Sequence, residues 1–178
     1  MHLALNAVSP GRPVDTLATA SLDPDPAVAQ QWVQVLSGSP ASYEGTGPLS
    51  ELVPDPDRSA AGIYDGIPFV AGPVPMDATM GWPPQEEDTW WSVLWSSPAD
   101  TAVLLVREPP GDLARQVVHA EGAVEEETGD ALPDEPDQGD TETYASAVST
   151  ALFGFDVTTM SPGRIDPAAL EVHHFRLS

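Results

Sequence analysis

Two apolar runs in the middle of the chain predict the centre of an antiparallel sheet. Residues 89–95 and 101–107 are rich in aromatic and β-branched side chains, and a short polar segment separates them. Such a spacing is typical of a β-hairpin. The prolines and glycine of residues 109–112 favour a further turn, and Val117 and Val118 within 113–124 indicate a third strand. We therefore expect a meander centred on residues 89–124 to form the middle of the core.

Two segments have the apolar spacing and the end signals of helices. Residues 26–37 follow Asp25, which suits the N-cap position, begin with a proline and end before Gly38. Several valines in this segment would also suit a strand. Residues 143–153 place apolar side chains at helical spacing, with Thr141 or Thr143 suited to cap the helix, and stop at Gly154. The sequence therefore predicts two helices, at about 26–37 and 143–153.

Three further segments show weaker strand patterns. Residues 1–22 alternate between apolar and polar positions on both sides of a Ser-Pro-Gly turn, which predicts a strand pair. Residues 62–71 are typical of a strand that bends at Gly66, and Pro68 favours a place near a sheet edge. Residues 169–177 predict a final strand.

Proline, glycine and acidic residues predict long connections between these elements. Residues 39–58 and 72–88 are rich in Pro and Gly, which favours irregular structure. Residues 121–142 contain ten acidic side chains and no basic one, so they bury too little apolar surface to order themselves and predict an acidic loop or tether. The sequence therefore predicts a single α+β domain over residues 1–178, with an antiparallel sheet, two helices and long Pro/Gly-rich loops.

The charge of the chain narrows the classes of partner. The 178 residues include 28 Asp and Glu against 6 basic residues, all of them Arg, which gives a formal net charge of -22. A surface this acidic repels phosphate backbones and anionic membranes, so we expect neither nucleic acid nor a membrane as a direct partner. The depletion of Arg as well as Lys favours either solubility in high salt or attraction to a cationic partner.

Signals for export and for membrane insertion are also missing. The first residues contain no cationic leader with a long apolar core, and the longest aliphatic run, 102–106, is too short to span a bilayer. Without Cys there is no disulfide framework and no thiolate chemistry. We therefore expect a cytoplasmic protein, or a virion component if it takes part in assembly.

Few residues offer catalytic chemistry. Without Lys there is no phosphate-binding loop, and neither a Gly-x-Ser-x-Gly elbow nor a His-Glu-x-x-His zinc motif occurs. His119 and Glu121 would share one face of the expected strand and form a His–carboxylate pair suited to base chemistry or cation binding. Such pairs arise by chance in an acidic chain, and a structural histidine is the commoner case. We predict no cofactor and no metal site.

The acidic run and one tryptophan supply the candidate binding residues. Negative charge speeds the encounter with a basic protein, and a buried aromatic side chain holds the complex together. Trp82 is the tryptophan that strand alternation does not assign to the core, and capping the end of the sheet is its alternative role. The candidate binding residues are Trp82, Glu125, Glu126, Glu127, Asp130, Asp134, Glu135, Asp137 and Asp140.

Three functions fit these observations. The first is a non-enzymatic acidic module that binds a basic protein, for example an immunity-type or anti-defence inhibitor. The second is a structural or assembly protein of a virion or appendage, whose strand edges at 62–71 or 169–177 contact neighbouring subunits. The third is a small metal-dependent hydrolase that uses His119 and clustered carboxylates. The lack of catalytic motifs favours the first.

Overall fold

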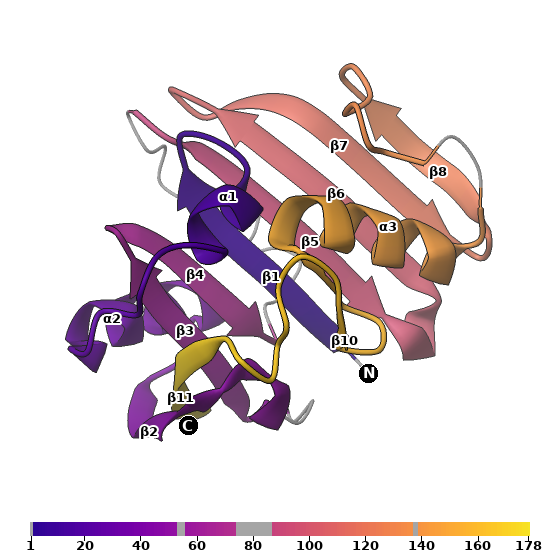
Figure 1. Ribbon diagram of the computed structural model, residues 1–178. Helices are drawn as coiled ribbons and strands as arrows, with labels where there is room; N and C mark the ends of the chain where they lie inside the picture. The colour runs from indigo at the N-terminus through magenta and orange to yellow at the C-terminus, as the bar shows by residue number, and fades with distance from the viewer. Residues whose placement is uncertain (1, 53–55, 74–86, 137–138) are drawn as a thin grey trace.

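The computed structural model describes residues 2–52, 56–73, 87–136 and 139–178. In these ranges nine strands form one antiparallel sheet, in the order β2-β11-β3-β4-β1-β5-β6-β7-β8 (Figure 1). The strands are β1 (His2–Ser9), β2 (Ala41–Pro48), β3 (Arg58–Tyr64), β4 (Ile67–Gly72), β5 (Thr89–Ser96), β6 (Thr101–Glu108), β7 (Asp112–Ala120), β8 (Ala123–Thr128) and β11 (Glu171–Leu177). A separate small sheet pairs β9 (Phe155–Asp156) with β10 (Ser161–Pro162).

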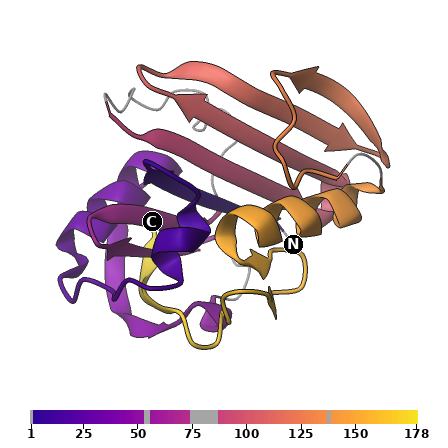
Figure 2. The ribbon, with the colours of Figure 1, turned by 45° about the horizontal axis from the view of Figure 1, so that its top comes forward.

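The helices of the described ranges pack on both faces of the large sheet. They are α1 (Pro13–Leu17), α2 (Pro26–Ser37) and α3 (Thr141–Phe153). On the central strand β1, Leu3 and Leu5 share a core cluster with side chains of α1 and α3, whereas Ala4 packs with α2. This alternation follows from the two-residue period of a strand. Figure 2 shows α3 lying along β5, β6 and β7. None of these helices has the length and apolar character needed to cross a membrane.

The structure confirms the antiparallel sheet of the predicted α+β fold and its central elements. The meander is present as β5, β6 and β7, which pair in sequence order. Helix α2 has the predicted bounds: the Asp25 side chain accepts a hydrogen bond from the Ala27 N–H at 3.0 Å, and Gly38 ends the helix with a left-handed φ of 66°. Helix α3 begins at Thr141 instead of residue 143, because Asp140 is its N-cap and accepts from the Thr143 N–H at 2.8 Å.

Two segments in the first third of the chain differ from expectation. Residues 13–17, expected within the second strand of a pair, form the short helix α1, with a proline at its start and Val14 and Leu17 buried. Residues 41–48, expected to be irregular, form β2, which pairs with β11. Glycine and proline weaken the local strand signal of this segment, and pairing with β11 overrides it. The loop predicted at 72–88 lies outside the described residues except at its two ends.

Residues 62–71 belong to a hairpin and not to a single bent strand. Asp65 and Gly66 have positive φ values of 49° and 83° and make the two-residue turn between β3 and β4. Neither strand lies at an edge, and β11 lies between β2 and β3, so the edges expected at 62–71 and 169–177 are wrong. Pro68 is tolerated inside the sheet because the register of β4 with β1 starts after it, at Phe69.

The acidic segment 121–142, expected to be a loop or tether, contains a strand. Glu121 and Gly122, with φ values of 50° and 79°, make a tight turn, after which β8 pairs with β7. All residues of β8 are exposed, so this strand requires backbone pairing but no burial of acidic side chains. The two outer strands of the sheet are therefore β2 and β8.

Asn6 is a polar residue in the middle of the core. It lies on β1 between Val70 of β4 and Ser92 of β5 and has no exposed surface. Within the part of the chain that the structure describes, neither its amide oxygen nor its amide nitrogen has a hydrogen-bond partner. An unpaired buried amide costs about 1–3 kcal/mol.

We predict that Asn6→Val raises the free energy of unfolding by about 1–2 kcal/mol, because it removes the unpaired amide and keeps a side chain suited to a strand. Urea denaturation measures the change. Asn6→Asp is the matched control and should lower the free energy of unfolding, because it buries a charge. A clear loss of stability in Asn6→Val would contradict the assignment of an unpaired amide.

Candidate functional site

The outer strand β8 carries the densest group of acidic residues near a sheet edge. Glu126 and Glu127 lie opposite Val118 and Val117 of β7, and Val124 lies opposite His119. The register shifts between Val118 and His119, so Glu125 is the extra residue of a β-bulge. Two consecutive glutamates therefore share one cross-strand position.

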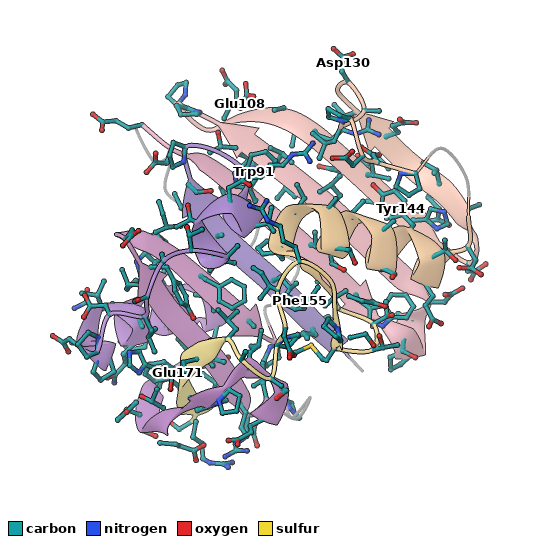
Figure 3. All side chains as sticks on the ribbon, viewed as in Figure 1. Trp91, Glu108, Asp130, Tyr144, Phe155 and Glu171 are labelled. Carbon is teal, nitrogen blue, oxygen red and sulfur yellow. The ribbon has the colours of Figure 1, made fainter. Side chains whose placement is uncertain are left out.

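Three of the predicted binding residues are exposed and unpaired. Glu125 and Glu126 on β8 and Asp130 in the turn after it make no ion pair within the described structure. Figure 3 labels Asp130 near one end of the molecule and Glu171 on the far side. We call Glu125, Glu126 and Asp130 the acidic edge.

A buried arginine holds the acidic segment onto the sheet. The side chain of Arg115, on β7, is 3% exposed, and that of its partner Glu135 is 5% exposed. Arg115 Nε donates to Glu135 Oε2 at 3.0 Å, Nη2 donates to Glu127 Oε1 at 2.9 Å, and Nη1 donates to the Gly129 carbonyl at 2.7 Å. A second hydrogen bond joins Arg115 Nη2 to Glu135 Oε1. The guanidinium thus ties β7, β8 and the turn after β8 together.

Glu135 is an internal anion and not a free binding residue. Its carboxylate also accepts hydrogen bonds from the Leu132 N–H at 3.0 Å and from the Tyr144 hydroxyl at 3.1 Å. Burial alone would raise the pKa of Glu135, but the hydrogen bonds from Arg115 and Leu132, together with the charge of Arg115, hold this pKa below its ordinary value. The hydrogen bond to Glu135 raises the pKa of Arg115 in turn. Glu135, one of the predicted binding residues, therefore lies inside the protein and not on its surface.

The other predicted binding residues are engaged or lie outside the described residues. Glu127 pairs with Arg115, and Asp134 pairs with Arg12. Asp140 caps α3, and the backbone hydrogen bond from Thr143 lowers its pKa. Trp82 and Asp137 lie outside the described residues.

The arginines of the chain do not neutralise the acidic edge. Five of them form ion pairs with carboxylates elsewhere, and Arg107 donates to the Gly111 carbonyl at 3.1 Å. Among the ion pairs of the described residues, the one that reaches β8 joins Arg115 to Glu127, not to Glu125 or Glu126. No arginine of the described structure therefore forms an ion pair with the acidic edge.

His119 is a structural residue that fastens the β7–β8 turn to α3. Its ring is 4% exposed and stacks on Tyr144 with a centroid distance of 5.3 Å. The Thr141 hydroxyl accepts from the Gly122 N–H at 3.0 Å and makes a second hydrogen bond with His119 Nδ1 at 3.1 Å. His119 and Glu121 were expected to share one face of a strand. Because β7 ends at Ala120, Glu121 lies in the turn instead and does not share a strand face with His119.

A groove of about 700 Å³ runs along the exposed side of α3. Small and hydroxyl side chains line it, together with Asp134, Asp140, Glu142 and Asp156. Burial would raise the pKa of Asp156, but hydrogen bonds from the Thr158 hydroxyl and N–H outweigh it and lower this pKa. Over the described ranges, no group of three or more His, Asp or Glu side chains is arranged to hold a metal ion.

Comparison of the chain with protein-family models, with curated proteins and with solved structures finds no match. The geometry and charge of the acidic edge are therefore the observations that bear on function.

We predict that Arg115→Met lowers the free energy of unfolding by about 3–5 kcal/mol, because it leaves Glu135 buried without its cation. The double variant Arg115→Met/Glu135→Leu should recover much of this loss, because it removes both buried charges. Chemical denaturation of the wild type and both variants measures the difference. Equal stability of the single variant and the wild type would show that the pair is not the clamp described.

The same pair predicts a pH dependence. Because the pKa of Glu135 is lowered in the folded protein, its stabilisation is present above the ordinary value of 4.5 and is lost as the pH falls through the folded-state pKa. The stability difference between the wild type and Glu135→Gln should therefore shrink as the pH falls below about 4.5. Using the difference cancels the repulsion among the other carboxylates, which both proteins share. A difference that grows toward acid pH would contradict the lowered pKa.

Proposed function

We propose that this protein is a non-enzymatic binding module that engages a basic protein through the acidic edge. The observation that carries the proposal is the pairing pattern: the arginines are tied to other groups, while Glu125, Glu126 and Asp130 stay exposed and unpaired around an outer strand. Unneutralised charge on the surface raises the rate of encounter with a partner of opposite sign.

The exposure of these carboxylates supports a role in recognition. A charge that is already buried, such as Glu135, cannot reach a partner, whereas an exposed carboxylate meets a cation with only partial desolvation. The high net charge of -22 extends the attraction beyond the three residues of the acidic edge. In its most concrete form, the proposal is an inhibitor that covers a basic groove of another protein.

The alternatives gain no comparable observation. An assembly role at 62–71 or 169–177 required exposed edges, and both segments lie inside the sheet. A hydrolase role used His119 with clustered carboxylates, and the buried His119 faces Thr141 and Tyr144.

We predict that Glu125→Gln/Glu126→Gln weakens the binding of a basic probe more than a matched control does. The probe is a fluorescent peptide of alternating Lys and Thr, and anisotropy measures its affinity. Removing two exposed ion pairs should lower the affinity for the peptide roughly three- to tenfold at low ionic strength. The loss should shrink as salt is raised toward physiological strength, because exposed charges are then screened.

The control is Asp65→Asn/Glu171→Gln, which removes two exposed carboxylates from the other half of the sheet. Asparagine suits the positive φ of 49° at residue 65. If both double variants weaken binding equally, the acidity acts as a general surface charge, as solubility in high salt requires, and the proposal of a localised site fails.

A further inference from the structure

We infer that the partner supplies an extended basic segment that adds to the sheet as a strand beside β8. This inference rests on the proposed function and specifies how the acidic edge is used. Among the described residues, β8 is the last strand of the sheet and pairs with β7 on one side, so its other side presents backbone groups without a strand partner. An added strand pairs with such groups by main-chain hydrogen bonds.

The turn between β7 and β8 determines which backbone groups of β8 point away from β7. The two-residue turn at Glu121 and Gly122 makes Ala120 and Ala123 a hydrogen-bonded pair. Because such pairs alternate with wide pairs, the next pair, His119 and Val124, exchanges no backbone hydrogen bonds. The N–H and C=O groups of Val124 therefore point away from β7, toward the open side. The Val124 side chain is 51% exposed, so an added strand would also cover apolar surface.

Charge selects the kind of strand. If a second copy of the chain paired antiparallel along β8, Glu125 and Glu126 would lie close to the same glutamates of that copy, and like charges on adjacent strands are destabilising. A strand with Lys or Arg at alternate positions would place its cations on the face of these glutamates. The acidic edge thus opposes self-pairing and favours a basic segment.

The opposite edge of the sheet lacks this combination. On β2, Glu44 already accepts hydrogen bonds from Arg58 at 2.7 Å and from Arg176 at 2.8 Å, so its charge is neutralised within the chain. The strand also contains Gly45 at a φ of 151° and ends in Pro48. These features interrupt a regular edge. Of the two outer strands, β8 is the one that joins an open backbone edge to unneutralised charge.

The test compares three forms of the alternating Lys–Thr peptide with the full-length protein. One form is unmodified, one has every Lys amide N-methylated, and one has every Thr amide N-methylated. All three carry the same charge, but an added strand turns the amides of only one alternate set toward β8. We expect one methylated form to bind at least about tenfold more weakly than the unmodified peptide and the other to bind within about twofold of it. The unmodified peptide should also slow hydrogen exchange at the Val124 amide.

The outcomes separate this inference from the proposed function. If both methylated peptides change affinity equally, or if the Val124 amide stays unprotected, strand addition is wrong. The proposal of a charge-based site is then still decided by the binding of the Glu125→Gln/Glu126→Gln variant. If the unmodified peptide binds that variant as tightly as the wild type, the proposed function fails as well. If the protein alone dimerises and the Val124 amide is protected in the dimer, a second copy occupies the edge and the inference is overturned.

Discussion

The buried guanidinium of Arg115 is the interaction on which the acidic half of the protein depends. Moving an arginine and a glutamate out of water is costly, and the pair persists because every polar direction is satisfied. Arg115 reaches two carboxylates and a backbone carbonyl, while Glu135 accepts further hydrogen bonds from Leu132 and Tyr144. One cation therefore fixes a segment that is too acidic to order itself by burying apolar surface.

This clamp determines which acids remain available to a partner. It buries Glu135 and ties the exposed Glu127 to Arg115, and Arg12 pairs with the exposed Asp134. His119 and Thr141 fix the turn at the other end of β8. With both ends of the strand anchored, Glu125 and Glu126 are presented on a defined backbone and not on a loose tether. A fixed edge loses less conformational entropy on binding than a disordered acidic tail would.

The sequence predicts the elements whose signals are local. Helix α2 is marked by Asp25, a proline and Gly38, and the β5–β6 hairpin by two apolar runs. It does not predict β2 or β8, because glycine, proline and glutamate have low strand propensity and these edge strands depend on a distant or neighbouring partner strand. The acidic run located the candidate site, but the pairings within it depend on tertiary contacts. The lone arginine at a core-facing position of β7 is the sequence signal that could have indicated the clamp.

The glutamates of β8 have two roles that follow from one physical property. An open strand edge is a hazard because any exposed strand can pair with it, and charged side chains on the edge are one of the ways that proteins prevent this. Negative charge excludes neutral and acidic strands, including a second copy of the same chain, but it does not exclude a basic strand. The same glutamates therefore both prevent self-pairing and select a cationic segment. A protein that protected this edge with lysine would be equally safe from self-association, and it would favour acidic segments instead.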